Sequence, residues 1–460
     1  MKTLGYILPV ALAICLGAAS CSDDVDGGKL TPTNIVSSTL EDGSKIDVLL
    51  HKTMTVKYSH PVEVVNPAGI TLNGVPVEAK ANVCELILNL NPLPDTEYTL
   101  TIAPGAVKRF EKTDQVPEGL TVHFTTLPAP VIADAPCNPA ANEPAKALYS
   151  RLRSIYGSKT ATGTAGGGVW DTGYYDFITG ATGSAPAFVA FDFAEINNTK
   201  KPVAYGDISK VREVYEAGGV PVLNWNWAVP RVNKPGASLT TEVKDFVASR
   251  IFEEGTWENG VAREHVAKLA GYLRQLQDAG VAAVFCPIPD GVTDYSGDAL
   301  CWWGNEGIDV YNRLWKWLYA TLTDTYGINN LLWQWTPAML DNAKAALWQT
   351  VAKSYPGDRY VDLVGVPVSS DTDLFTDFST WYTARQAAGG VKMVGMTGCG
   401  MLPDVEANLA SSASWLYFIQ NADIDTGEYG FFKYSSVATW SKLIASPAVL
   451  DREGLKAIEK

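Results

Sequence analysis

Eight apolar segments recur along residues 146–460, and amphipathic segments with a helical period separate them. This alternation favours a parallel sheet, because each helical crossover returns the chain to the same edge of the sheet. Eight strands, seven crossovers and a closing helix near 435–444 suit a (β/α)8 barrel with loop insertions. The predicted strands are 159–164, 187–193, 220–225, 282–287, 331–335, 361–366, 392–397 and 415–418.

Residues 30–127 carry a different pattern, in which short runs rich in Val and Thr alternate with turn residues such as Asn73-Gly74. All 14 Trp lie at or after Trp170, so the two parts also differ in composition. We expect an all-β sandwich that resembles bacterial immunoglobulin-like modules and acts as a spacer, with carbohydrate binding as the alternative. Five Pro then predict a semi-rigid linker over 128–145. The strands expected before it are 45–51, 53–58, 69–72, 83–90, 98–102 and 120–126.

The first 21 residues indicate export. Lys2 precedes an apolar run that is too short to span a bilayer, which is typical of a signal peptide. Ala18-Ala19-Ser20-Cys21 resembles a bacterial lipoprotein cleavage site, so we expect lipidation of Cys21; an ordinary secretory signal is the alternative. The segment 22–26, Ser-Asp-Asp-Val-Asp, resembles the acidic export tag of some Gram-negative surface lipoproteins. The expected location is the outer-membrane surface, through a lipid anchor.

Charge and composition exclude two classes of function. Lys and Arg number 36 against 50 Asp and Glu, and the resulting charge of −14 disfavours nucleic acid as a partner. The four His are scattered and no Cys-x-x-Cys occurs, so we expect neither a zinc site nor another cofactor. Cys286 and Cys399 follow strands 4 and 7, where they form either a disulfide or two buried thiols.

In such barrels the chemistry lies at the carboxyl ends of the strands. These ends carry carboxylates, amides and an unusual number of tryptophans, and indole faces are surfaces on which sugar rings stack. The alternative for the tryptophans is a place in the core, which we expect for the helical Trp315, Trp317, Trp348 and Trp440. The predicted sugar-binding residues are Asp192, Trp225, Asn226, Trp302, Trp303, Trp335 and Trp415.

Taken in order, these motifs resemble glycoside hydrolase family 26, whose best-known members are β-mannanases. The similarity covers about residues 146–450. The segments 186–192, 218–230 and 360–365 are similar to the family's strand-2, strand-3 and strand-6 motifs, and 285–290 with Trp302-Trp303-Gly304 is similar to its acid/base segment. The resemblance implies a (β/α)8 barrel and recognition of a β-linked polysaccharide, with β-mannan as the expected one.

The catalytic positions depart from the family pattern. The strand-4 motif Arg-Pro-x-His-Glu has become 286–290, Cys-Pro-Ile-Pro-Asp, so that Asp290 replaces the general acid/base. The nucleophile of the strand-7 motif Thr-Glu is replaced by Gly398. Asn226 replaces a His after strand 3, and 365–369 has lost the family's Asp and Tyr. Retaining hydrolysis needs two carboxyl groups about 5–5.5 Å apart, so the resemblance implies a barrel that no longer cleaves its glycan.

The sequence therefore predicts a surface lipoprotein that binds β-mannan without hydrolysing it, with other surface glycan-uptake proteins as candidate partners. An active endo-acting hydrolase is the alternative, with Asp290 and Asp192 as an inverting acid pair. Asp294, Asp298 and Glu306 are further acids of the strand-4 loop. A third interpretation is an assembly partner of neighbouring surface proteins that has no affinity for glycans.

Overall fold

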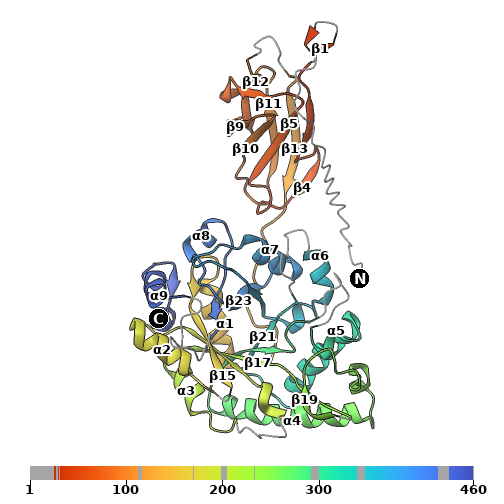
Figure 1. The fold of residues 1–460 in the computed structure, drawn as a ribbon, viewed down its shortest axis with the longest axis vertical. Coiled ribbons are helices and arrows are strands. Elements are labelled where there is room, and N and C mark those ends of the chain that lie inside the picture. Colours follow the sequence, from red (N-terminus) through yellow and green to blue (C-terminus); the bar gives the residue numbers. More distant parts are fainter. Residues whose placement is uncertain are drawn as a thin grey trace. The chain divides into compact units, whose positions relative to one another are not determined.

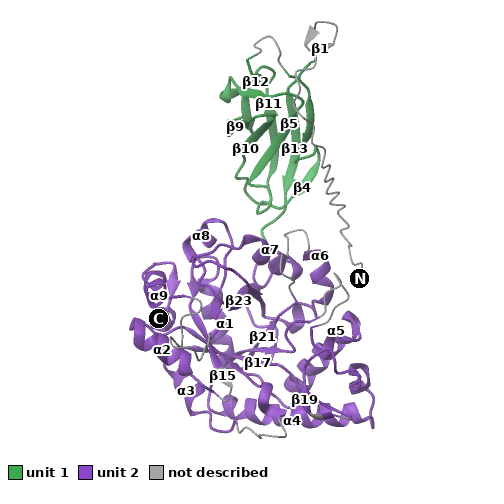
Figure 2. Ribbon diagram, in the orientation of Figure 1, with its two compact units in different colours: residues 1–129 green, residues 130–460 purple. Residues whose placement is uncertain are grey.

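The structure is a computed structural model, in which the chain forms two compact units, Met1–Ala129 and Pro130–Lys460 (Figure 2). No helix within the described ranges combines the length and the apolar character that crossing a bilayer requires. The structure describes residues 25–26, 29–30, 32–111, 117–168, 170–197, 205–232, 234–291, 300–338, 348–422 and 435–458.

The first unit contains two main β-sheets that share one hydrophobic core, which includes Val56, Leu86, Leu100 and Phe124. The all-β prediction is therefore confirmed, whereas the immunoglobulin-like assignment stays a prediction. One sheet has the order β3 (Ile35–Ser38), β5 (Thr53–Tyr58), β10 (Glu85–Asn89), β9 (Glu78–Asn82). The other has the order β4 (Ser44–Ile46), β13 (Leu120–Thr126), β11 (Glu97–Ile102), β7 (Ile70–Leu72), β8 (Val75–Pro76).

The second unit is a closed barrel of eight parallel strands, as predicted. Helices surround it, as Figure 1 shows. The strands are β15 (Gly163–Gly168), β16 (Phe188–Asp192), β17 (Val220–Trp225), β20 (Ala283–Pro287), β21 (Leu331–Trp335), β22 (Leu363–Val368), β23 (Met393–Cys399) and β24 (Phe418–Gln420). The helices are α1 (Glu143–Ile155), α2 (Gly173–Thr182), α3 (Ser209–Glu216), α4 (Trp257–Asp278), α5 (Ile308–Ala320), α6 (Trp348–Val351), α7 (Phe378–Ala387), α8 (Val405–Ala410), α9 (Val437–Ile444) and α10 (Arg452–Ala457).

The first and last barrel strands differ from their predicted positions. The residues predicted to begin the first strand form β14 (Thr160–Ala161) instead, which pairs with β25 (Val449–Leu450) outside the barrel. In the last strand, the barrel pairing starts only at Phe418, which pairs with Met396 of β23. The predicted 159–164 and 415–418 thus lie about three or four residues too early, because apolar β-rich residues continue beyond the barrel at both places.

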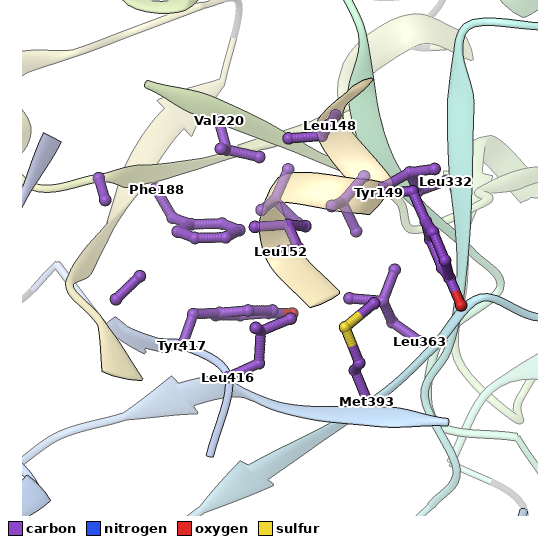
Figure 3. Close-up of a cluster of buried hydrophobic side chains, with 14 of the residues drawn as sticks. Leu148, Tyr149, Leu152, Phe188, Val220, Leu332, Leu363, Met393, Leu416 and Tyr417 are labelled. Atoms are coloured by element: carbon purple, nitrogen blue, oxygen red, sulfur yellow. The ribbon is translucent and has the colours of Figure 1, made fainter. Parts of the chain in front are cut away.

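Helix α1 closes the amino-terminal end of the barrel. Its side chains Leu148, Tyr149 and Leu152 pack against residues from the starts of the strands, among them Phe188 and Leu363 (Figure 3). Asn142 begins the helix by accepting a hydrogen bond from the backbone N–H of Ala145. Because this end is filled by apolar side chains, the carboxyl ends of the strands remain for a functional site.

Much of the predicted linker 128–145 belongs to the barrel unit. The backbone N–H of Cys137 donates to the buried carboxylate of Asp362 at 2.5 Å, and Asn138 donates to Asn329 at 2.9 Å. The hydroxyl of Tyr149 donates to the carbonyl of Ala133 at 3.0 Å. Asp362 and Asn329 lie 225 and 191 positions away in the sequence, so the Pro-rich composition alone suggests a free linker where the structure has a packed segment.

Candidate functional site

Asp192 and Asn226, two of the predicted sugar-binding residues, meet at the carboxyl ends of neighbouring strands. The Asn226 side-chain amide donates to Asp192 Oδ2 at 2.5 Å, and the backbone N–H of Ala194 donates to Asp192 Oδ1 at 2.8 Å. Burial raises the pKa of the Asp192 carboxyl, while these hydrogen bonds oppose the rise. In the register of the parallel strands, Asp192 pairs with Asn224 of β17, and Asn224 pairs with Cys286 of β20.

Asp290 follows β20 in a backbone conformation that few residues adopt. Its φ is +52°, in the left-handed region that Asp and Asn tolerate better than other side chains. Its side chain is partly buried, and burial raises the pKa of Asp290 to about 6. Burial also raises the pKa of Cys286 to about 12, and the charges of Asp290 and Asp192 add to that rise. The strand register places Asp192 at the Cys286 end of β20, and Asp290 follows that strand end in the chain.

The raised pKa of Asp290 predicts a dependence of stability on pH. In the folded state the Asp290 carboxyl keeps its proton up to about pH 6. In the unfolded chain the same carboxyl loses its proton near its ordinary pKa of 3.8. The contribution of Asp290 to the free energy of unfolding then falls as pH rises from about 4 to about 6. Asp290→Asn keeps the shape and removes the titration, so we expect it to be more stable than wild type by about 2 kcal/mol at pH 7 and by much less at pH 4.

Urea unfolding at both pH values measures this difference. Asp278→Asn, at an exposed position at the end of α4, is the control and should show no such change with pH. A gap between wild type and Asp290→Asn that is equal at pH 4 and pH 7 would contradict the burial argument.

Gly398, at the predicted nucleophile position, is partly exposed near the end of β23. A Cβ atom built there would lie 3.0 Å from Asn421 Oδ1, just after β24. The strand end thus presents an amide where the family pattern has a carboxylate. Sequence analysis missed Asn421, because the predicted last strand ended too early; the signal was the polar pair Gln420-Asn421 after an apolar run.

The acids of the strand-4 loop, and those that follow β23, are either engaged in other hydrogen bonds or lie outside the described residues. Glu306 accepts a hydrogen bond from the backbone N–H of Ser249 at 3.1 Å. Asp404 begins helix α8 by accepting from the N–H of Ala407, and Glu406 accepts from the Ser446 hydroxyl at 2.6 Å. Asp294 and Asp298 lie outside the described residues.

Cys286 and Cys399 are two free, buried thiols, which was one of the two predicted states. The sulfur of Cys286 lies 3.1 Å from Thr336 Oγ1, and that of Cys399 lies 3.5 Å from the carbonyl oxygen of Ile419. The thiols fill space in the barrel interior without bridging it.

The predicted stacking surface is not present. Trp225, Trp302, Trp303, Trp335 and Trp415 expose 0, 1, 0, 0 and 2% of their surface, so none offers an open indole face to a sugar ring. The prediction also placed Trp415 in the last barrel strand. In the structure Trp415 precedes β24, and its carbonyl accepts a hydrogen bond from Thr160. The pattern of strand ends cannot distinguish an indole that turns inward from one that faces solvent.

Several of these buried indoles pack on other aromatic rings and donate hydrogen bonds to backbone carbonyls that follow the strand ends. Trp225 stacks on Trp227 with ring centroids 4.4 Å apart. The indole N–H of Trp302 donates to the carbonyl of Trp227 at 2.6 Å, and that of Trp303 donates to the carbonyl of Pro289 at 3.0 Å. Trp303 therefore holds the backbone one residue before Asp290.

Partly or fully exposed polar side chains remain at the ends of β16, β17, β20, β23 and β24. Carboxylates and amides of this kind are hydrogen-bonding partners for sugar hydroxyls. They are Asp192, Asn224, Asn226, Asp290, Thr397 and Asn421, which we call the polar rim.

A (β/α)8 barrel with carboxylates at the ends of its strands is an architecture of glycoside hydrolases. The family model for glycosyl hydrolase family 26 matches residues 137–442, which is well over half of the chain. The chain therefore belongs to glycosyl hydrolase family 26.

The curated proteins that this chain resembles include mannanases. A mannan endo-1,4-β-mannosidase from Thermothelomyces thermophilus is 28% identical over 61% of this chain and 55% of its own length. One from Bacillus subtilis is 26% identical over 50% of this chain and 65% of its own length. The chain spans about half the length of the first curated relatives that it matches.

Solved structures give the same result. The family-26 domain of an endo-β-mannanase/endo-β-glucanase from Prevotella bryantii has a TM-score of 0.62 at 28% identity, covering 70% of this chain and 99% of that domain. A β-mannanase from a symbiotic protist of the termite Reticulitermes speratus, solved with a gluco-manno-oligosaccharide, has a TM-score of 0.60 at 27% identity, covering 71% of this chain and 98% of its own.

Proposed function

We propose that this protein recognises a β-mannan-type polysaccharide at the polar rim and does not hydrolyse it. The observation that carries the proposal is Gly398, because a retaining mechanism needs a carboxylate there to attack the anomeric carbon. Asn421 takes up the space in front of Gly398 and offers an amide in place of that nucleophile. The mannanases among its relatives support a mannan-type glycan as the ligand.

An inverting hydrolase is the second candidate, and the raised pKa of Asp290 favours it. A carboxyl with a pKa of about 6 is partly protonated near neutral pH, as a general acid requires. Asp192 would have to activate the water as a base. Its two oxygens already accept hydrogen bonds from Asn226 and Ala194, and these bonds weaken it as a base.

Binding at the polar rim is tested by Asn226→Ala. This change removes one direct amide contact and releases the Asp192 carboxylate from its partner, so we expect affinity for mannohexaose to fall about tenfold or more. Calorimetry on the purified protein measures the change. Asn89→Ala, which removes a comparable amide–carboxylate bond to Glu78 at 2.7 Å in the first unit, is the matched control. Equal affinity in both variants would place the ligand elsewhere.

We further propose that the protein is anchored at the outer-membrane surface through Cys21, with the N-terminal β-unit as a spacer and surface glycan-uptake proteins as partners. Cys21 lies outside the described residues, and the lipoprotein-like segment supports the proposal. Cys21→Ala should move the protein from the membrane to the soluble fraction, since each buried methylene of the lipid chains contributes about 0.8 kcal/mol. A variant that still sediments with membranes would contradict the anchor.

A further inference from the structure

A groove runs between helices α4 and α5 on the outer side of the barrel, apart from the polar rim. It consists of two adjoining cavities of about 560 and 520 Å³, and both are lined by Arg263 of α4 and Trp317 of α5. Each volume lies within the range of roughly 300–1,000 Å³ that small-molecule pockets occupy. Trp317 was expected in the core, but its indole is only half-buried, unlike that of Trp315.

Cations surround this indole. Arg313 lies one helical turn before Trp317 on the same face of α5, and its guanidinium covers the Phe252 ring at 4.1 Å from the centroid. Lys316 also lines the groove, with its ammonium 5.7 Å from the centroid of the Tyr360 ring. Within the described part of the chain, neither Arg313 nor Lys316 has a carboxylate partner within 4 Å.

Two acidic residues, Glu254 and Glu264, also line the groove, and both are exposed. Glu254 lies 3.8 Å from Arg263 with 90% of its side chain exposed, which makes a weak ion pair. Glu264 lines only the cavity of about 520 Å³. Three cations against two acids leave the groove with a small positive excess on a chain of net charge −14, and the cations nearest the indole, Arg313 and Lys316, suit an anionic group.

We propose that this groove is a second glycan site, which binds an acidic oligosaccharide that carries uronic acid groups. A pyranose ring would lie on the exposed part of the Trp317 indole, and Arg313 and Lys316 would bind its carboxylate. An acidic peptide also carries carboxylates, but its Asp and Glu side chains have no ring that would stack on the indole. The combination of indole and guanidinium therefore favours the sugar. This site is independent of the proposed function.

The test is calorimetry of the full chain with tetragalacturonic acid, mannohexaose and hexaglutamate. Tetragalacturonic acid should bind, and Trp317→Ala and Arg313→Glu should each weaken it at least tenfold. Trp317→Phe, which keeps an aromatic ring, should recover much of the affinity and rules out loss of folding as the cause. Trp257→Ala, on the same helix pair but outside the groove, is the control. Higher salt should weaken binding.

Several results would overturn the proposal. They are the absence of tetragalacturonate binding, equal binding of hexaglutamate, or affinity that Trp317→Ala leaves unchanged. Asn226→Ala should leave tetragalacturonate binding unchanged while it weakens mannohexaose binding. Failure of the groove and failure of the polar rim are therefore measured separately.

Discussion

Placing Glu at both family positions, by Asp290→Glu with Gly398→Glu, should leave the protein at least about 10³-fold less active than an intact family enzyme on β-mannan. The reason is the surroundings of the two positions. Residue 290 has a φ of +52°, which a Glu occupies at a cost of about 1–2 kcal/mol. A side chain at 398 would bring its Cβ within 3.0 Å of Asn421 Oδ1, so the Asn421 side chain would have to shift. Both acids would therefore be misplaced, and misplacement by 1 Å costs about 10²-fold.

The groups that tune such acids are also absent. Cys286 is a buried thiol next to Thr336, where the family pattern has an Arg that would hold charge near the nucleophile. A missing electrostatic partner costs about 10²–10³-fold in rate. Release of reducing sugar from β-mannan measures the activity, and the single Gly398→Glu variant is the control. A double variant within tenfold of an intact mannanase would contradict this explanation.

Trp302→Ala should destabilise the barrel unit by about 3–5 kcal/mol, because the indole is 1% exposed and its removal leaves a large cavity. The change also removes the hydrogen bond to the Trp227 carbonyl and edge-to-face contacts with Phe246 and Trp303. Urea unfolding followed by circular dichroism measures the free energy of unfolding.

Trp257→Ala is the matched control for this loss, since Trp257 is 41% exposed and packs against the same Phe246. We expect it to cost no more than about 1–2 kcal/mol. If Trp302→Ala folds as stably as wild type but loses mannohexaose binding, the indole is a stacking surface after all.

The barrel was predictable because its strands are buried on both faces, and such strands appear in the sequence as continuous apolar runs. The predicted 220–225 and 331–335 match β17 and β21 to the residue. The ends of the barrel were less predictable. Pairing of β14 with β25 joins residues almost 300 positions apart, and nothing in the local pattern indicates it.

The candidate site was predictable where it depends on strand order alone. Asp192 and Asn226 end neighbouring parallel strands, so their meeting follows from the topology. The burial of the tryptophans was not predictable. A Trp at the end of a strand gives the same sequence pattern whether its indole faces solvent or packs inward, as Trp225 does on Trp227. Asn421 was missed because the predicted last strand ends two residues before β24 does.

The central claim is that this family-26 barrel binds a mannan without cleaving it. Incubating the purified wild-type protein with β-mannan, followed by chromatography of the products and by affinity electrophoresis in a mannan-containing gel, tests both parts. The account predicts retarded migration in the gel and no oligosaccharides after long incubation. Oligosaccharides that appear with wild type would contradict it, and their disappearance with Asp290→Asn would identify Asp290 as an acid that the cleavage requires.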